Sequence, residues 1–268
     1  MLPPRLVASD LDGTLLDEAG AATERTTRTW RRLWDRGIET VLVTARPPRW
    51  VGHLAPITGD HGVVICGNGA FVYDLAHGLM RESHGIAPDA VLDLVSDLRR
   101  ELPGIVFSAE LADGFHREEA YPATAPDGAP ETAPPTVGPL EGLSGPVGKL
   151  LAVSDRVPDE EFLTTVREVV GERALLSTSC DGGLAEIGPR GVTKASALAD
   201  WTEQLGIDAA DVWAFGDMPN DIPMLSWAGT AWAVANAHPD VLAVADHVAP
   251  AHDEDGVARV LERWIEGS

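Results

Sequence analysis

Short apolar runs alternate with helical patterns at the start of the chain, and this alternation restricts the fold more than any other feature. The run Leu6–Ser9 ends at Asp10 and is followed by a glycine-containing loop and a helical pattern over 22–36. A second apolar run, Glu39–Val43, comes next, and a further helical stretch is predicted over 47–54. A strand, a helix and a second strand in this order predict a right-handed βαβ unit, and hence a parallel sheet.

The middle of the chain has a different pattern. A helix predicted over 88–102 precedes two strand-like runs, and a second helix, over 158–170, lies between further strand-like runs. Helix–strand–strand units used twice predict an α+β domain of its own. The stretch 121–146 contains seven prolines and predicts a surface loop within that domain.

The βα alternation returns after the middle region. A helix that ends near Leu205 is followed by an apolar strand at Val212–Phe215 and by further strands and helices. We therefore predict an α/β fold with a doubly wound, Rossmann-like parallel sheet that is interrupted by an inserted α+β domain. The core is expected over 1–82 and 190–268, and the inserted domain over 83–189.

Composition narrows the classes of function. The chain of 268 residues has 42 acidic and 20 basic side chains, a net charge of −22, and 44% hydrophobic residues. This is a globular composition, and it argues against nucleic-acid and anionic-membrane binding because both require a basic face. Small phosphorylated metabolites stay compatible if a cation screens the charge. We expect a monomer or a small homo-oligomer.

Cysteine usage and hydropathy indicate the compartment. The chain has two cysteines, Cys66 and Cys180, and they are far apart in the sequence. A disulfide framework and a structural zinc site are therefore not expected. No apolar run approaches the length that spans a membrane. These features predict a soluble cytoplasmic protein.

Two carboxylates follow the first predicted strand directly. Asp10 and Asp12 stand two residues apart, and Gly13 allows the chain to turn immediately after them. Residues at the carboxyl end of a strand in an open α/β sheet face the ligand crevice. One carboxylate can then act as nucleophile and metal ligand, while the other serves as acid and base. The alternative is an Asp-Gly turn with both acids in solvent.

A second acidic pair follows the strand Val212–Phe215. Asp217 stands at the strand end and Asp221 at the start of the next helix, and this spacing lets both reach a Mg²⁺ ion already held by Asp10. The alternative is helix capping, in which the acids complement the helix dipole. Two acidic clusters at the ends of two core strands would repel each other without a cation, which favours the metal site.

A phosphate group also needs hydrogen-bond donors. Thr44 follows the second strand and offers a hydroxyl and a backbone N–H at the same sheet edge, with Arg46 just beyond as a candidate substrate-binding residue. Lys194 opens the helix by which the chain re-enters the core, where it can act as a point charge against phosphate. The alternative for Lys194 is a surface lysine that extends into solvent.

Taken together, these motifs resemble those of the haloacid dehalogenase (HAD) superfamily, specifically Cof-like phosphatases with an α/β cap inserted between the second and third motifs. Ala45 and Ala235 stand where this group often has glycine, and neither difference removes a catalytic group. The segments that match its four motifs are Asp10–Leu15, Val43–Pro47, Gly191–Lys194 and Gly216–Asp221, and the resemblance also includes Gly67–Ala70 and Val234–Pro239.

The resemblance implies phosphoryl transfer through a covalent aspartyl-phosphate. Asp10 would attack phosphorus, and Asp12 would protonate the leaving alkoxide and later activate water. Thr44 and Lys194 would hold the phosphoryl oxygens. The cap would close over the site and exclude bulk water.

The resemblance also implies a Mg²⁺ cofactor. Its ligands would be the Asp10 carboxylate, the Asp12 backbone carbonyl and Asp217, with Asp221 in support. Asn220 would position Lys194 or the phosphate. The inserted domain would select the substrate.

Three functions are compatible with these residues. The first is a Mg²⁺-dependent phosphatase of small phosphomonoesters: sugar phosphates, or nucleotide or cofactor phosphates. The second is a phosphomutase or phosphotransferase with the same nucleophile, in which a hydroxyl group accepts the phosphoryl group. The third is a non-catalytic receiver module, against which Asp12 and the large inserted domain both argue.

Overall fold

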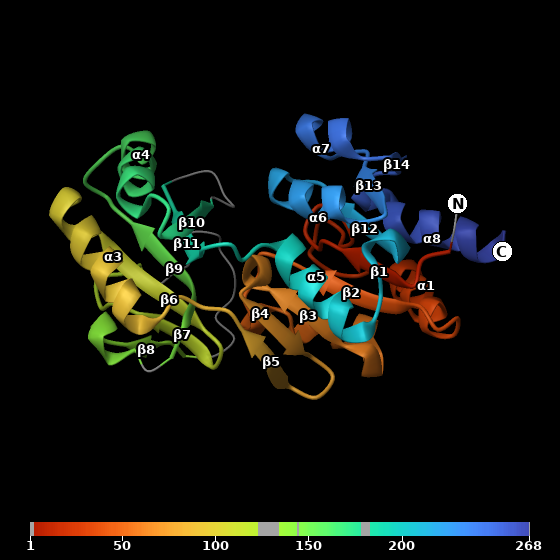
Figure 1. The fold of residues 1–268 in the computed structure, drawn as a ribbon, viewed down its shortest axis with the longest axis horizontal. Coiled ribbons are helices and arrows are strands. Elements are labelled where there is room, and N and C mark those ends of the chain that lie inside the picture. Colours follow the sequence, from red (N-terminus) through yellow and green to blue (C-terminus); the bar gives the residue numbers. More distant parts are fainter. Residues whose placement is uncertain (1–2, 123–133, 144, 178–182, 268) are drawn as a thin grey trace. The chain divides into compact units, whose positions relative to one another are not determined.

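The computed structural model describes residues 3–122, 134–143, 145–177 and 183–267, and it contains two compact units (Figure 1). We call them the core and the cap. The cap contains 82–192 together with the short segment Pro47–Trp50, whose sequence neighbours on both sides belong to the core. The sequence predicts the inserted domain over 83–189. It did not indicate that Pro47–Trp50 belongs to the same unit.

The core is built around one sheet of eight strands. Neighbouring strands run parallel from one edge as far as β3, and β4 then pairs antiparallel with β3. From β1 the chain winds outward through β2 and β3 on one side and through β12 to β14 on the other, so the winding direction reverses between β1 and β12. Ligands of doubly wound sheets bind at such a reversal, outside the carboxyl ends of the strands. In spatial order the strands are β14 (His247–Ala249), β13 (Thr230–Val234), β12 (Val212–Gly216), β1 (Leu6–Ser9), β2 (Glu39–Val43), β3 (Val63–Cys66), β4 (Phe71–Asp74) and β5 (Leu79–Ser83).

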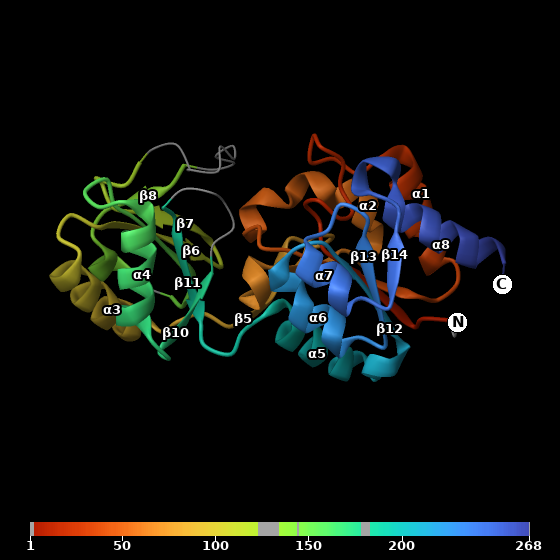
Figure 2. The same ribbon diagram turned by 90° about the horizontal axis from the view of Figure 1, so that it is seen from above.

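Helices cover both faces of the core sheet (Figure 2). The apolar sides of these helices and the strands form one buried cluster, in which Trp30 and Leu33 of α1 are at most 1% exposed. One face carries α1 (Glu24–Trp34), α2 (Ala55–Thr58) and α8 (Gly256–Glu266), and the other carries α5 (Lys194–Leu205), α6 (Ile222–Trp227) and α7 (Pro239–Val244). This arrangement confirms the predicted fold class.

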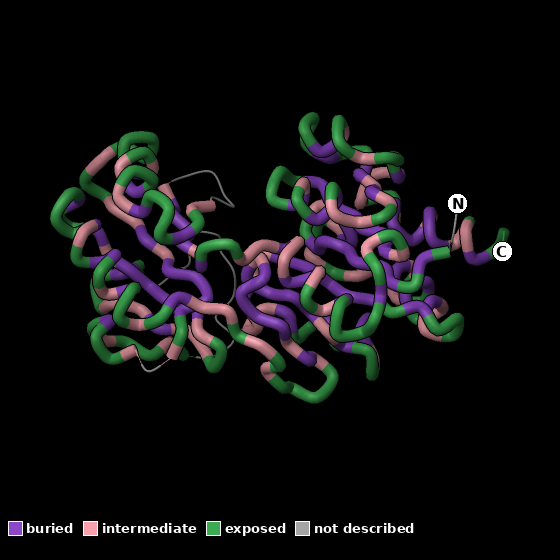
Figure 3. Tube along the Cα trace, in the orientation of Figure 1, coloured by how far each residue is buried: buried purple, intermediate pink, exposed green. Residues whose placement is uncertain are grey.

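The cap has a sheet of its own with two helices on one face. The apolar side chains of α3 and α4 form a second buried cluster with Phe107 and Leu150 of the sheet. In Figure 3 the traces of β6 and β9 are mostly coloured as buried. Its strands pair antiparallel except β7 and β8, which pair parallel. The helices are α3 (Pro88–Glu101) and α4 (Asp159–Val170), and the strands in spatial order are β10 (Ala174–Ser177), β11 (Ala185–Pro189), β9 (Val147–Val153), β6 (Val106–Leu111), β7 (Gly114–Arg117) and β8 (Thr136–Val137).

Several elements differ from the sequence-based expectation. The helix predicted over 47–54 is replaced by 3₁₀ turns at Pro48–Trp50 and Gly52–Leu54. The two successive prolines there lack the N–H groups that a regular helix requires. The short strands β5, β8 and β14 and the helix α7 were not predicted. Within the proline-rich loop predicted over 121–146, residues 123–133 and 144 lie outside the described residues.

Over the parts of the chain that the structure describes, every helix is too short or too polar to cross a bilayer.

Candidate active site

The predicted site residues lie at the ends of three adjacent strands. Asp10 follows β1, Asp217 follows β12 and Thr44 follows β2, and β1 lies between the other two strands in the sheet. The backbone N–H of Asp10 donates to the carbonyl of Phe215 at 3.0 Å, which ties the end of β1 to β12. The parallel topology thus brings residues from distant parts of the chain to one edge of the sheet.

Three buried carboxylates meet at this edge. Asp10, Asp217 and Asp221 each offer an oxygen, these oxygens lie within 4.8 Å of one another, and the residues are 6%, 6% and 0% exposed. Lys194, which is 2% exposed, donates through Nζ to Asp10 Oδ1 at 2.5 Å and to Asp221 Oδ1 at 2.6 Å. Its burial excludes the alternative of a lysine that extends into solvent.

The cluster is unbalanced in charge. With all three acids ionised, three carboxylates and one ammonium would leave two negative charges in a buried site. Burial, together with the charges of Asp221 and Asp217, raises the pKa of Asp10 well above its usual value, against the opposing effect of Lys194. Burial and the charge of Asp221 likewise raise the pKa of Asp217. Burial lowers the pKa of Lys194, but Asp10 and Asp221 outweigh it, and the pKa is raised.

The neighbouring backbone and hydroxyl groups fix the carboxylates. Asp221 Oδ2 accepts from the backbone N–H groups of Asp217 at 3.1 Å and Met218 at 3.0 Å, while Thr14 Oγ1 donates to Asp217 Oδ1 at 2.7 Å. Gly13 has a φ of 74°, and a Cβ atom there would lie 2.4 Å from Asp217 Oδ2. A residue without a side chain is therefore required at position 13.

The ligand set fits a hard divalent cation. Asp10, Asp217 and Asp221 offer carboxylate oxygens only, which are the ligands preferred by Mg²⁺. A divalent ion would also cancel the two excess negative charges. Asp12 is expected to contribute its backbone carbonyl to the metal, and its side chain lies outside this group of carboxylates.

Asp12 is instead paired with Arg46. The guanidinium donates to both carboxylate oxygens of Asp12, through Nε at 2.8 Å and Nη2 at 2.5 Å. The Asp12 side chain is 56% exposed. Arg46 was predicted to bind substrate. In the structure it forms an ion pair with Asp12, which was predicted to act as acid and base.

Thr44 and Asn220 differ in detail from the expectation. The backbone N–H of Thr44 is not free for phosphate, because it donates to the carbonyl of Ile65 at 2.8 Å as part of the sheet. The Thr44 hydroxyl accepts from the N–H of Arg46 at 3.0 Å and keeps its own proton to donate. Asn220 Nδ2 donates to Asn68 Oδ1 at 3.2 Å. Among the described residues, the hydrogen bonds of Lys194 Nζ go to Asp10 and Asp221.

Some supporting residues were not predicted from the sequence. Thr14 holds Asp217, and Asn236 Nδ2 donates to the carbonyl of Gly13 at 2.8 Å. Asn68 adopts a φ of 55° next to Thr44, whose carbonyl accepts its N–H at 2.9 Å. Asn68 and Asn236 belong to segments that matched the family pattern, but their hydrogen-bond partners depend on the fold.

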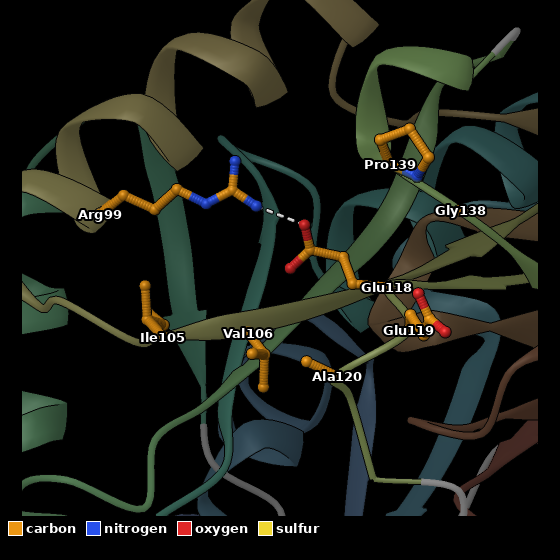
Figure 4. A pocket seen from close by; sticks show the side chains of 8 residues that line it. All are labelled: Arg99, Ile105, Val106, Glu118, Glu119, Ala120, Gly138 and Pro139. Atoms are coloured by element: carbon orange, nitrogen blue, oxygen red, sulfur yellow. Dashed lines mark hydrogen bonds and ion pairs between the residues drawn. The ribbon is translucent and has the colours of Figure 1, made fainter.

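The cap contains a separate cavity (Figure 4). It has a volume of about 350 Å³ and lies between Arg99 of α3, Val106, Glu118 and Pro139. Arg99 and Glu118 form an ion pair at its wall, and the second oxygen of Glu118 accepts from the N–H of Phe107 at 2.9 Å. None of these residues belongs to the acidic cluster.

Known proteins resemble the chain over nearly its whole length. A family profile described as haloacid dehalogenase-like hydrolase matches residues 7–261 and confirms the resemblance inferred from the motifs. The 5-amino-6-(5-phospho-D-ribitylamino)uracil phosphatase YcsE of Bacillus subtilis is 26% identical over 97% of this chain and 96% of its own length. An HMP-PP phosphatase of Escherichia coli O157:H7 is 28% identical over 98% and 96%. A haloacid dehalogenase-like hydrolase of Bacteroides thetaiotaomicron, solved as a crystal structure, superimposes with a TM-score of 0.81 at 25% identity over 97% and 98%.

Proposed function

The chain belongs to the haloacid dehalogenase-like hydrolases, and from this premise we propose that it is a Mg²⁺-dependent phosphatase of small phosphorylated metabolites. Sugar phosphates are the first candidates, followed by nucleotide and cofactor phosphates. The two curated relatives named above are both phosphatases, and one is named for a substrate with a phosphorylated ribityl chain. These names support the reaction class, while the substrate of this chain is part of the proposal.

One observation carries the proposal: the excess of buried negative charge at the reversal point of the sheet. Asp10, Asp217 and Asp221 are held around a single ammonium, that of Lys194, although burial of unpaired carboxylates is unfavourable. A site built only for stability would balance its charges. A divalent cation would supply the positive charge that this arrangement lacks, and together with the Lys194 ammonium it would attract an anionic phosphoryl group.

The reaction that fits these residues has two steps. First, an Asp10 carboxylate oxygen forms a bond to phosphorus, the bond from phosphorus to the ester oxygen breaks, and Asp12 gives a proton to the departing alkoxide. Second, a water oxygen bonds to phosphorus while Asp12 takes a proton from that water. The bond between Asp10 and phosphorus then breaks and releases inorganic phosphate.

The remaining residues bind the phosphoryl group. The Lys194 ammonium and the Thr44 hydroxyl would bind its oxygens. Lys194, the first residue of α5, donates to Asp10, and Thr44 follows β2, the strand beside β1. To reach the ester oxygen, the Asp12 carboxylate must leave its ion pair with Arg46. The Asp12 side chain is 56% exposed, so it has room to rotate. Positioning and charge neutralisation account for most of the catalysis of phosphoryl transfer.

The metal site would use the residues of the buried cluster. Asp10, Asp217 and Asp221 would hold Mg²⁺ through their carboxylates, together with the Asp12 backbone carbonyl that the family resemblance implies. When bound, the ion neutralises phosphate charge and favours attack by an anionic carboxylate.

The test is phosphate release from a panel of sugar, nucleotide and cofactor monophosphates, with Mg²⁺ and with a chelator in its place. We expect release only with Mg²⁺. An Asp10→Asn protein, purified in the same way, controls for contaminating phosphatases. Equal release with the chelator would contradict the metal assignment.

The same panel separates the other two functions. A phosphomutase or phosphotransferase would move phosphate to an added sugar hydroxyl faster than it releases phosphate. A receiver module would accumulate phosphoprotein and release almost no phosphate. Either result would replace hydrolysis as the activity of this site.

A further inference from the structure

The loop after β1 is contacted by two turns that follow more distant strands of the core sheet. In the turn after β13, Asn236 Nδ2 donates to the carbonyl of Gly13 at 2.8 Å. In the turn after β14, His252 Nδ1 donates to the carbonyl of Leu16 at 3.0 Å. The reaction proposed above gives neither Asn236 nor His252 a role, although the loop that they contact carries the proposed nucleophile.

The side-chain amide of Asn236 has a partner at each end. Its nitrogen donates to Gly13, and its oxygen accepts from the backbone N–H of His252 at 3.0 Å. A flipped amide would bring its nitrogen against that N–H and its oxygen against the Gly13 carbonyl, so the two partners permit one orientation only. Asn236 therefore joins the loop after β1 to the turn after β14.

The turn after β14 is fixed by its own backbone. The N–H of Gly256 donates to the carbonyl of Ala251 at 3.1 Å, and a Cβ atom at position 256 would lie 1.9 Å from the carbonyl oxygen of Pro250. The two chain segments approach too closely for any residue other than glycine. The N–H of His252 is consequently held in a fixed place, and the Asn236 amide takes its position from it.

The contact at Gly13 reaches the carboxylate cluster through Thr14. The Gly13 carbonyl belongs to the peptide that leads into Thr14, and the Thr14 hydroxyl donates to Asp217 Oδ1 at 2.7 Å. In addition, the N–H of His238, two residues after Asn236, donates to the backbone carbonyl of Asp217 at 2.8 Å. The turn after β13 therefore contacts both loops that carry the three carboxylates.

Asn236 is exposed, whereas the Thr14 next to its partner Gly13 is buried. Water can replace an exposed amide as a hydrogen-bond partner, so removal of the Asn236 side chain should cost the folded state little. Water is not tied to the turn after β14, however, and it would leave the peptide between Gly13 and Thr14 free to shift. The contribution of Asn236 is therefore to position that peptide rather than to stabilise the fold.

We infer that Asn236 is a positioning residue of the proposed Mg²⁺ site. It fixes the peptide between Gly13 and Thr14 against the turn after β14, and through Thr14 it fixes the Asp217 carboxylate. The inference rests on the proposed function and adds a residue that takes no part in the reaction itself. Removal of a group that orients a metal ligand commonly lowers metal affinity or activity roughly 10- to 100-fold. Mg²⁺ binding is sensitive to such changes because the ion requires near-ideal octahedral geometry.

The first experiment titrates Mg²⁺ alone into wild type and Asn236→Ala by calorimetry. We expect the Mg²⁺ affinity to fall roughly 10-fold in Asn236→Ala, while urea unfolding without Mg²⁺ stays close to wild type. Phosphate release should need roughly 10 times more Mg²⁺ for its half-maximal rate and should return to the wild-type rate at saturating Mg²⁺. Gln204→Ala, which removes an exposed amide about 15 Å along α5 from Lys194, is the control and should keep the wild-type affinity.

The second experiment isolates the hydrogen bond between Asn236 and His252. His252→Pro removes the N–H from which Asn236 accepts, and His252→Ala removes the same side chain but keeps the N–H. Proline fits there, because position 252 opens a 3₁₀ turn and Ala251 before it is extended, with φ −62° and ψ 158°. We expect the Mg²⁺ affinity to be roughly 3-fold lower in His252→Pro than in His252→Ala, and equal in the two when Asn236→Ala is also present.

These results separate the inference from the proposed function. Unchanged Mg²⁺ affinity in a folded Asn236→Ala protein would overturn the positioning role and leave a Mg²⁺-dependent phosphatase intact. Equal affinities of His252→Pro and His252→Ala with Asn236 present would overturn the link through the turn after β14. Mg²⁺ binding that weakens in Asn236→Ala, without phosphate release by any of the proteins, would support the positioning role and overturn the phosphatase.

Discussion

The core and the cap both bury charged side chains, but they balance them differently. In the core, three carboxylates surround one lysine, and the cluster has two negative charges in excess. Among the described residues of the cap, each buried acid has a basic partner: Lys149 binds Glu186, and Arg49 binds Glu110. The cap pairs are complete in charge within the protein, whereas the core cluster needs a cation from outside.

This difference indicates that the carboxylate cluster of the core and the ion pairs of the cap have different roles. An unbalanced cluster at strand ends prepares a centre for a metal ion and a phosphoryl group, where charge changes during the reaction. A balanced network on a sheet face needs no ion from outside, but removing one partner of a pair leaves the other charge buried and uncompensated. The predictions that follow test this distinction.

The largest expected effect is on activity, from Asp10→Asn in the core. The substitution removes the proposed nucleophile and one of the crowded negative charges. We expect phosphate release to fall roughly 10⁴-fold or more, while the stability without metal stays equal or rises. Phosphate release and urea unfolding measure the two effects. Substantial remaining activity in a folded Asp10→Asn protein would contradict the nucleophile assignment.

The corresponding change in the cap should affect stability. Lys149→Met leaves Glu186 buried without its ammonium, and we expect a loss of about 3–5 kcal/mol in the free energy of unfolding. Replacing both partners, as Lys149→Met with Glu186→Leu, should restore most of that loss. The control Arg100→Met breaks a pair whose arginine is 65% exposed and should change stability by less than about 1 kcal/mol. A small effect of Lys149→Met alone would contradict the expectation that the Glu186 carboxylate is costly to bury without the Lys149 ammonium.

Metal binding should distinguish the two units directly. At a Mg²⁺ concentration about 100 times Kd, we expect roughly 2.7 kcal/mol of stabilisation. Asp217→Asn should abolish the effect and Glu186→Gln should preserve it. Because the pKa values of Asp10 and Asp217 are raised, protons compete with the ion, and the stabilisation should shrink as the pH is lowered. Thermal unfolding with and without Mg²⁺ measures it, and equal shifts in both variants would place the ion elsewhere.

The smallest expected effect concerns Asp74, a paired acid at the edge of the core. Burial alone would raise the pKa of Asp74, but hydrogen bonds from Arg81 and His77 outweigh it and lower the pKa. The pair therefore stabilises the protein above the unfolded pKa, and this contribution is lost as the pH falls through the lower folded value.

We expect Asp74→Asn to cost about 0.5–1 kcal/mol near neutral pH, since Arg81 and His77 are 50% and 62% exposed. The difference in the free energy of unfolding between Asp74→Asn and wild type should become smaller toward pH 3. Urea unfolding at several pH values measures it. A difference that grows on acidification would reverse the assigned direction of the pKa shift.

Much of the core site was predictable because it depends on local sequence. Asp10, Thr44 and Asp217 each follow a short apolar run, and parallel strands place their carboxyl ends at one edge. The roles of Asp12 and Arg46 were harder to assign, since both look like independent functional groups in the sequence. Their bidentate pair exists only because the loops after β1 and β2 meet.

The sequence by itself determined the fold class, the inserted domain and the residues at the strand ends, because side-chain periodicity and residue type are local properties. The tertiary structure decided the hydrogen-bond partners. It assigned the N–H of Thr44 to the sheet, and it joined Arg49 to Glu110 in the cap. Such partners are set by strand register and by loop approach, and neither is encoded at a single position.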